Sequence, residues 1–148
     1  MDRADKDSLV RTIGWRERID LIDLNVSGVE AKIDTGATSC ALHAFFIREL
    51  DLDGEPHVEF TLHPNRNAHH PEVLCRAPMV GERIVRSSNG SEEERPVIAT
   101  RIRLGGEVHE IELTLTNREA MEYRMLIGRD LLRGRYLVDA DASYICGQ

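Results

Sequence analysis

The residues best suited to chemistry lie in Asp34-Thr35-Gly36-Ala37, directly after an apolar run that ends at Ile33. A carboxylate followed by a small residue and a glycine suits a sharp turn, in which backbone amides approach the carboxylate oxygens. Such a carboxylate can accept a proton from water or return one, which indicates general acid–base hydrolysis. The same tripeptide is also common in ordinary turns, so alone it leaves catalysis and a purely structural turn as alternatives.

A second motif, about ninety residues later, makes the first one more specific. The apolar run Met125-Leu126-Ile127 is followed by Gly128-Arg129-Asp130-Leu131-Leu132, a pattern typical of a short buried strand that continues into a brief helix. A glycine at this junction permits close backbone packing beside another chain segment. Each motif therefore follows the end of a predicted strand.

Short strands are the predicted elements around these motifs. One strand is predicted from Ile19 to Val26, with Ser27-Gly28 as a turn into the alternating run Val29–Ile33. The segment Leu42–Leu50 is predicted as a strand that continues into a short helix, and Val58–Leu62 as an alternating strand.

The clearest structural prediction is a long hairpin in the middle of the chain. Arg83–Arg86 leads into Ser87-Ser88-Asn89-Gly90-Ser91 and Pro96–Leu104 returns, with Asn-Gly as a strong turn signal. Gly105-Gly106 then turns into the strand Val108–Leu115. Loops or single turns are predicted over 63–71 and 117–122, and the last strand over Tyr136–Val138. Many short strands with turn signals predict an all-β barrel with one short C-terminal helix.

Composition and charge predict one compact, acidic domain. The chain has 148 residues, with 19 Lys plus Arg and 26 Asp plus Glu, for a net charge of −7. This acidity argues against a bulk nucleic-acid binder, which carries a basic face. We expect residues 1–12 to form a flexible arm and residues 13–148 to form the single domain. The start lacks an apolar signal segment, and no stretch is apolar and long enough to span a bilayer. The three cysteines, Cys40, Cys75 and Cys146, are widely spaced and odd in number, which does not suggest a disulfide framework. We therefore expect a cytoplasmic protein without a membrane partner.

Taken together, these motifs resemble a known family. The order of strand, Asp-Thr-Gly-Ala, long hairpin and Leu-Ile-Gly-Arg-Asp-Leu-Leu resembles that of a retropepsin-like aspartic protease. The chain is also similar to the bacterial, RimB-like group named ATP-dependent zinc proteases, which is associated with ATP-grasp peptide ligases of the RimK type. The closer match extends from Ile13 to Tyr144 and is carried by the segments 13–17, 31–37, 41–44, 60–64, 85–90, 94–98 and 113–118.

The resemblance implies a retropepsin-like closed β-barrel that forms a homodimer. Such enzymes use two aspartates, and this chain has one Asp-Thr-Gly, so it implies a dyad of Asp34 with the Asp34 of a second copy. Two adjacent carboxylates share a proton, so the ionised one would activate water and the protonated one would assist the departing amine. The resemblance also implies that Thr35 braces the dyad and that Gly36 offers backbone to substrate.

Further site residues follow from the same resemblance. It implies structural roles for Gly128 and Arg129, and substrate contacts from Ala37, Arg86, Ser87, Ser88, Asn89, Gly90 and Arg95. One departure concerns Thr38, because viral retropepsins commonly carry a carboxylate there that pairs with the arginine of the Gly-Arg helix. Thr38 cannot form that ion pair, so the partner of Arg129 stays open.

Arginines are dense around the predicted hairpin. The segment 76–86 contains Arg76, Arg83 and Arg86 against the one acidic residue Glu82, so it is locally positive in an acidic chain, and Arg95 follows on the returning strand. They form either a solvated face of the hairpin or the lining of a cleft for an acidic peptide. The second alternative fits a family that occurs beside ligases that add glutamates to protein tails. The resulting functional hypothesis is an aspartic peptidase that acts on acidic or glutamate-extended tails.

Two further hypotheses remain. One is a catalytically weak or inactive retropepsin-like module that binds acidic tails or regulates an ATP-grasp ligase. The other is a zinc metallopeptidase that uses the only dense group of ligand-type side chains, His63, His69, His70 and Cys75. That group lacks a standard zinc spacing and His-Glu-x-x-His is incomplete, so a polar loop is the preferred interpretation and no cofactor is predicted. Because the sequence contains no phosphate-binding Gly-rich loop, any use of ATP would belong to a partner.

Overall fold

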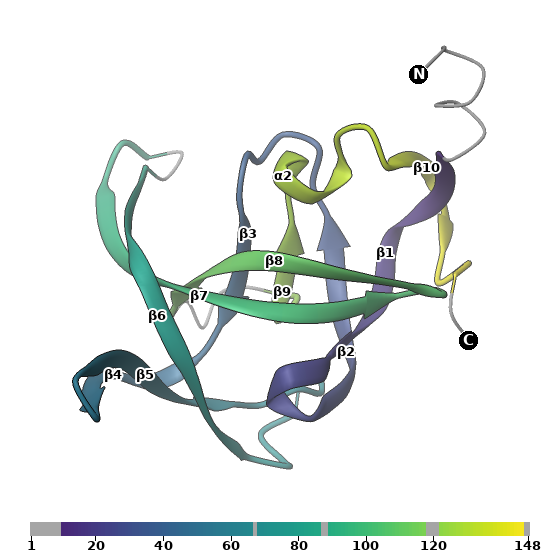
Figure 1. Cartoon of the computed structure of the whole chain (residues 1–148). Helices are drawn as coiled ribbons and strands as arrows, with labels where there is room; N and C mark the ends of the chain where they lie inside the picture. Colours follow the sequence, from purple (N-terminus) through teal and green to yellow (C-terminus); the bar gives the residue numbers. More distant parts are fainter. Residues whose placement is uncertain (1–9, 67, 87–88, 118–121, 147–148) are drawn as a thin grey trace.

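The computed structural model describes residues 10–66, 68–86, 89–117 and 122–146 (Figure 1). The elements in chain order are β1 (Arg11–Leu21), the 3-10 turn η1 (Ile22–Leu24), β2 (Val26–Ile33), β3 (Cys40–His43), β4 (Phe45–Leu52), β5 (Glu55–Leu62), β6 (Val73–Arg86), β7 (Glu92–Leu104), β8 (Glu107–Thr116), β9 (Met125–Ile127), α2 (Arg129–Leu132) and β10 (Tyr136–Ser143). Within the described residues α2 is the only α-helix, which confirms the predicted all-β class with one short C-terminal helix. No helix in this part is long and apolar enough to cross a membrane.

The strands form one sheet that closes on itself in part. Its order is β10-β1-β2-β9-β3-β8-β7-β6-β5-β4, and β1 also pairs with β7. The strands β1, β2, β9, β3, β8 and β7 therefore form a ring in which each pairs with two others, while β6, β5 and β4 continue from β7. The largest fully buried side chains come from β1, β3, β5, β7, β8 and β9 and belong to one core: Ile13, Ile19, Leu21, Leu42, Phe60, Leu62, Ile98, Ile102, Leu104, Leu113, Leu115 and Met125.

The pairing of β2 with β9 positions the two sequence motifs. These strands run parallel, with Ile33 opposite Ile127 as the last pair in the register. The residues that follow these paired ends, Asp34 and Gly128, therefore lie at the same edge of the sheet. Figure 1 shows the loop after β2, α2 and the hairpin end of β6 and β7 at one end of the molecule.

The predicted strand over Ile19–Val26 is wrong, because η1 interrupts it. Asn25 adopts a left-handed conformation with φ of 57°, and its N–H donates to the Ile22 carbonyl. The turn therefore lies before β2, and the predicted Ser27-Gly28 turn is part of that strand. The physical reason is non-local, since Asp23 in η1 accepts hydrogen bonds from the backbone and guanidinium of Arg101 on β7.

The predicted helix at the end of Leu42–Leu50 is also wrong. Two strands occupy this segment, because β3 pairs with β8 and β9 while β4 pairs with β5. Phe46 takes a φ of 52° where the β4–β5 register shifts between Phe45 and Arg48. A bulge of this kind inserts an extra residue and interrupts the alternation of buried and exposed side chains, so the periodicity of the segment does not identify the strand.

The remaining strand predictions are confirmed. Strands were predicted within β5, within both arms of the β6–β7 hairpin and within β8, β9 and β10, and Arg86 pairs with Glu92 next to the hairpin turn. The predicted arm falls largely on residues 1–9, and the predicted turn over 117–122 largely on residues 118–121. Both stretches lie outside the described residues.

Candidate active site

The loop from Asp34 to Ala37 holds the Asp34 carboxylate in a defined orientation. The Asp34 N–H donates to the Ile127 carbonyl (2.8 Å), which ties the start of the loop to β9. The Gly36 N–H donates to Asp34 Oδ1 (2.9 Å), and the Ala37 N–H donates to the Asp34 carbonyl (3.2 Å). The half-buried Asp34 side chain has no hydrogen-bond partner at Oδ2 among the described residues, so one carboxylate oxygen is held by the loop and the other is not engaged by it.

Gly128 lets the second motif approach this loop closely. An added Cβ would lie 2.4 Å from the Ser39 carbonyl oxygen and 2.9 Å from that of Ala37, so only glycine fits. The next two N–H groups hold the same segment, since Arg129 N–H donates to the Ala37 carbonyl and Asp130 N–H to the Thr38 carbonyl, both at 2.8 Å. The N–H groups at the start of α2, which have no acceptor within the helix, therefore bind the carbonyls of the loop.

The structure identifies the partners of Arg129. Its guanidinium donates from Nη1 to the Thr35 carbonyl (3.0 Å) and from Nη2 to Thr38 Oγ1 (3.0 Å). Thr38 thus acts as a hydroxyl acceptor at the position where viral retropepsins carry a carboxylate. Arg129 bridges both sides of the loop without an ion pair, which answers the question that the sequence left open.

Cys40 is buried next to the Gly128 junction. Its sulfur accepts the Gly128 N–H at 3.5 Å, and burial raises the pKa of the thiol. Burial also raises the pKa of Cys75 to about 11 and that of Cys146 to about 12. High thiol pKa values keep these groups protonated near neutral pH, which suits packing better than nucleophilic chemistry.

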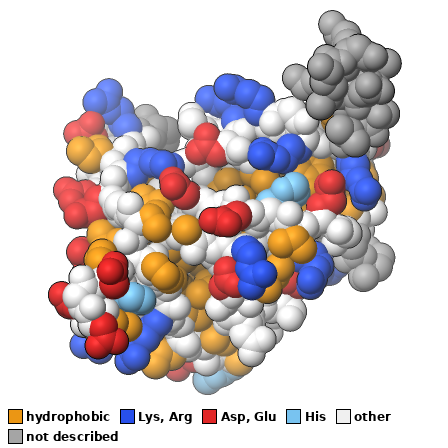
Figure 2. Space-filling view, in the orientation of Figure 1, with side chains coloured by type: hydrophobic (Ala, Val, Ile, Leu, Met, Phe, Trp, Pro, Cys, Tyr) orange, Lys and Arg blue, Asp and Glu red, His pale blue; other side chains and the backbone are white. Residues whose placement is uncertain are grey.

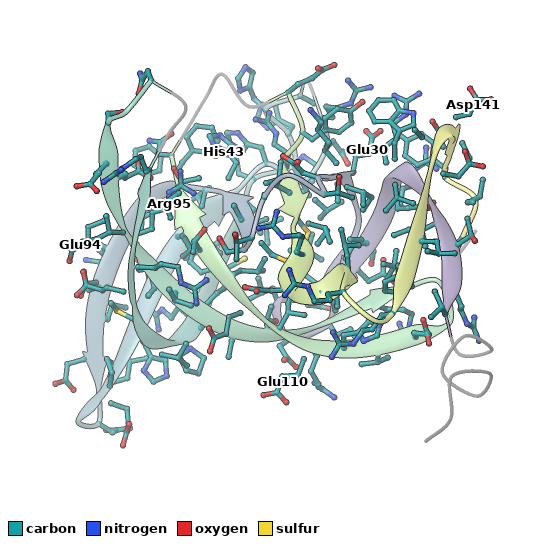
Figure 3. All side chains as sticks on the ribbon, turned by 90° about the horizontal axis from the view of Figure 1, so that it is seen from above. Glu30, His43, Glu94, Arg95, Glu110 and Asp141 are labelled. Carbon is teal, nitrogen blue, oxygen red and sulfur yellow. The ribbon has the colours of Figure 1, made fainter. Side chains whose placement is uncertain are left out.

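The predicted substrate-binding residues of the hairpin lie at two different depths. Arg95 on β7 is buried, donates to Glu93 (2.5 Å) and lies within 3.5 Å of Thr114 Oγ1, whereas Arg86 is exposed and pairs with Glu92 (2.9 Å). Figure 3 shows Arg95 on the inner side of this strand and Glu94 on the outside. Asn89 and Gly90 lie at the exposed turn, where Gly90 has a φ of 87°. Ser87 and Ser88 lie outside the described residues.

The other hairpin arginines are also paired with carboxylates. Arg76 contacts Glu59 (2.8 Å), and Arg83 contacts Glu112 (3.1 Å). Figure 2 shows basic and acidic side chains intermixed over the face formed by β7 and β8. This mixture means that the positive charge predicted near the hairpin is largely balanced by carboxylates on neighbouring strands.

The histidine-rich loop does not gather into a metal site within the described residues. His63 is buried and its Nε2 contacts Glu72 (3.0 Å), while His69 packs edge-on against the His63 ring. Hydrogen bonding to His63 lowers the pKa of the Glu72 carboxyl group. Cys75 is buried on β6 and contacts the Val73 carbonyl.

Sequence reasoning missed a basic surface beside the site. Lys32 lies two residues before Asp34 on β2, and Arg16 on β1 is its directly paired neighbour. The motif that contains Arg16 was noted only for its resemblance to the family. Its position next to Lys32 depends on the β1–β2 register, which residue spacing alone does not reveal.

Comparison with known proteins agrees with this geometry. The sequence model of the RimB-like family, described as retropepsin-like aspartic endopeptidase RimB, matches residues 12–148. A protein of unknown function from Legionella pneumophila has a similar crystal structure, with a TM-score of 0.75 and 31% identity over 92% of this chain and 97% of that one.

Curated relatives carry a different name. Proteins named "Probable alpha-L-glutamate ligase" from Shewanella pealeana and Desulfotalea psychrophila are 43% and 37% identical, over 92% and 97% of this chain. The chain spans only 30% and 31% of the length of these two relatives. Because the family match extends from Thr12 to the end of the chain, and the Asp34 loop lies against the Gly128 junction, the chain belongs to the RimB-like family of retropepsin-like aspartic endopeptidases.

Proposed function

We propose that the protein is an aspartic peptidase that works as a homodimer, with the dyad formed by Asp34 from each copy. The observation that carries the proposal is the orientation of the Asp34 carboxylate. Its Oδ1 accepts the Gly36 N–H, and its Oδ2 has no partner among the described residues. The loop that presents it is held by Gly128 and Arg129 on α2. Family membership supports the same chemistry.

The proposed reaction needs two carboxylates, and the Asp-Thr-Gly motif supplies one per chain. When two copies bring their Asp34 side chains together, the two charges repel and the pair retains one proton. The ionised carboxylate takes a proton from water as the oxygen attacks the peptide carbonyl carbon, and the protonated carboxylate gives its proton to the departing amine. Hydrolysis then leaves a carboxylic acid and an amine, and the dyad regains its single proton.

Thr35, Gly36 and Ala37 have supporting roles in this proposal. The Thr35 carbonyl is held by Arg129, so the loop keeps its shape when a second copy approaches. Gly36 is exposed next to the carboxylate and leaves room for a peptide backbone. The β6–β7 hairpin, including Arg86, Asn89, Gly90 and Arg95, would cover the bound peptide.

An acidic peptide is the proposed substrate class. Basic residues flank the Asp34 loop on both sides, with Lys32 on β2 and Arg129 on α2. The relatives named as glutamate ligases suggest glutamate-extended protein tails, because a ligase and a peptidase for the same bond would occur in one system. The peptidase would then remove the glutamates that its partner adds.

The ligase names also favour one alternative. The chain covers less than a third of these relatives, so it corresponds to one part of a longer protein in them. In the alternative, this part has no turnover and binds acidic tails or regulates the ATP-grasp ligase. The two functions differ in whether Asp34 is needed for any measurable activity.

The Asp34→Asn substitution separates the two functions. The purified chain is incubated with peptides that end in several glutamates, and products are identified by mass spectrometry between pH 4 and 8. The proposal predicts cleavage by the unmodified chain and none by the variant, with the same dimer mass in both by analytical ultracentrifugation. Cleavage that persists in the variant contradicts the dyad, and binding without cleavage by either protein favours the alternative.

A further inference from the structure

Basic residues without a carboxylate partner are unevenly distributed. Most described arginines form ion pairs, including those of the β6–β7 hairpin. The described basic residues for which no ion pair is found lie near the two motifs: Arg16, Arg18, Lys32, Arg124, Arg129, Arg133 and Arg135. Of these, Arg129 and Arg135 donate to backbone carbonyls around α2, and Arg124 is buried and donates to the Ala68 carbonyl.

Arg16, Arg18 and Lys32 share one outer face of β1 and β2, here called the β1–β2 basic face. Alternation places Arg16 and Arg18 on the same side of β1, on either side of the buried Glu17. The register puts Arg16 directly opposite Lys32, and Arg18 opposite Glu30. Like charges that face each other across a strand pair are destabilising, and among the described residues no carboxylate forms an ion pair with Arg16 or Lys32, so an added anion would stabilise this pair.

Aromatic rings hold the arginines of this face in place. The Arg16 guanidinium lies over Trp15 (4.7 Å) and over Tyr144 (4.9 Å), and Arg18 lies over the Tyr144 ring at 4.0 Å. Arg16 also donates to the Tyr123 hydroxyl at 3.0 Å. Stacking of this kind orders the side chains before a ligand arrives, which lowers the entropy lost on binding.

Carboxylates of the chain itself lie at one side of this face, where Glu30 is opposite Arg18. Glu30 accepts from the Tyr144 hydroxyl and lies 3.5 Å from Arg66, which also contacts Glu122 at 3.1 Å. Figure 3 shows Glu30 near several nitrogen-bearing side chains along one edge of the molecule. These contacts engage Arg66. Among the described residues no ion pair is found for Arg16, Arg18 or Lys32, and Glu30, opposite Arg18, is the carboxylate whose charge acts on Arg16.

A cavity of about 200 Å³ opens beside Lys32. Its lining includes Lys32, Glu122, Tyr123 and Leu126, so it joins the basic face to the loop before β9. Its volume is large enough for a single extended side chain. Lys32 lies about 7 Å along β2 from Asp34, because a strand rises about 3.3 Å per residue.

We propose that the β1–β2 basic face, with the cavity beside Lys32, is a subsite that binds glutamate or aspartate side chains of an acidic peptide substrate. The chemistry is pairing of carboxylates with Arg16, Arg18 and Lys32, with the aromatic rings of Trp15 and Tyr144 as walls. This inference rests on the proposed function for the identity of the substrate, and its location is new. The main contact with an acidic tail would then be made by Arg16, Arg18 and Lys32 on β1 and β2 rather than by the arginines of the β6–β7 hairpin.

An acidic peptide fits this face better than a nucleic acid. The net charge of −7 repels a polyanion as long as an oligonucleotide, whereas a few carboxylates need only a local basic patch. The three cations of the face lie on adjacent strands and span one or two residues of an extended peptide. The Glu122 carboxylate in the cavity wall is engaged by Arg66 and therefore repels the ligand less than a free carboxylate would.

The test measures binding in the Asp34→Asn protein, so that cleavage does not interfere. A fluorescein-labelled peptide with six glutamates is titrated by fluorescence anisotropy, with the six-glutamine peptide as its neutral counterpart. The double variant Arg18→Gln/Lys32→Gln is compared with Arg48→Gln/Arg103→Gln, which removes the same charge from exposed positions elsewhere. We expect the first pair to weaken binding of the glutamate peptide roughly 3- to 10-fold and the second pair to change it less than about twofold.

Each outcome has one meaning. Equal weakening by both double variants, or none by Arg18→Gln/Lys32→Gln, overturns the subsite even when the unmodified chain cleaves the peptide. Selective weakening supports the subsite even when no cleavage is found, in which case only the peptidase proposal fails. Unlabelled peptide and a single-stranded RNA oligonucleotide are also compared as competitors of the labelled peptide. If the RNA displaces the labelled peptide at a lower concentration than the unlabelled peptide does, the face is a nucleic-acid site and the proposed subsite is overturned.

Discussion

Replacing Gly128 by alanine tests whether close packing at the β9–α2 junction positions the Asp34 loop. The added Cβ would lie 2.4 Å from the Ser39 carbonyl oxygen and 2.9 Å from the Ala37 carbonyl oxygen. Both atoms are backbone, so the loop or α2 must move. The N-cap geometry of Gly128, with φ of −103°, suits any residue, so the effect is steric and does not come from backbone conformation.

The magnitude follows from three contributions. Overpacking costs about 1–3 kcal/mol, and weakening the Arg129 and Asp130 N–H bonds to the loop costs about 1 kcal/mol more. Alanine also reduces the entropy of the unfolded chain, which offsets about 0.4–1 kcal/mol. The net loss is about 1–4 kcal/mol, which lowers the melting temperature by roughly 3–14 °C in a domain of this size.

The assay is thermal and urea unfolding followed by circular dichroism, with Gly81→Ala as the control. Gly81 also lacks a positive φ, and an added Cβ there meets nothing within 4 Å, so its change should stay within about 0.5 kcal/mol. Cleavage, measured well below the melting temperature, should fall for Gly128→Ala and persist for Gly81→Ala. Equal melting temperatures for the two variants would refute the packing argument.

Three further predictions concern other parts of the structure. Arg129→Met removes both hydrogen bonds from the guanidinium to the loop and should lower the free energy of unfolding in urea by about 1–2 kcal/mol. Thr38→Val removes the acceptor of one of these bonds, so it should cost little more when Arg129 is already replaced. Equal costs of Thr38→Val with and without Arg129 would contradict the Arg129–Thr38 hydrogen bond. Glu17→Gln places an amide where a buried carboxylate accepts three backbone N–H groups, so we expect a loss of about 2–3 kcal/mol, and an unchanged unfolding midpoint would show that these bonds contribute little. Burial lowers the pKa of His109 in the folded chain. The contribution of His109 to the free energy of unfolding is therefore fully present above about pH 6.5, the ordinary histidine pKa, and is lost as the pH falls from there through the lower pKa of the folded chain. His109→Gln should therefore lose less stability than the unmodified chain between pH 7 and pH 5, and identical losses would contradict this assignment.

Local sequence patterns predicted the elements that carry the site. The apolar runs before Asp34 and before Gly128 are both strands, and the resemblance to retropepsins placed their ends in the same site. Asn89-Gly90 marked the hairpin because the turn needs residues that tolerate positive φ, and Gly90 has that conformation. In these cases the information lies within a few residues.

Long-range contacts explain what could not be predicted. The turn at η1 depends on Asp23 meeting Arg101, residues that are 78 positions apart. The partner of Arg129 is in part a backbone carbonyl, that of Thr35, which residue identity does not reveal. The Arg16–Lys32 pair appears only when the β1–β2 register is known.

A mixing experiment tests the shared dyad most directly. The unmodified chain and the Asp34→Asn variant are unfolded together, refolded at known ratios and assayed for cleavage of a glutamate-ended peptide at constant total protein. If each active site needs Asp34 from two copies, activity falls with the square of the unmodified fraction, to about one quarter at equal amounts. A linear decrease, to about one half, would mean that each chain cleaves alone and would contradict the proposed dyad.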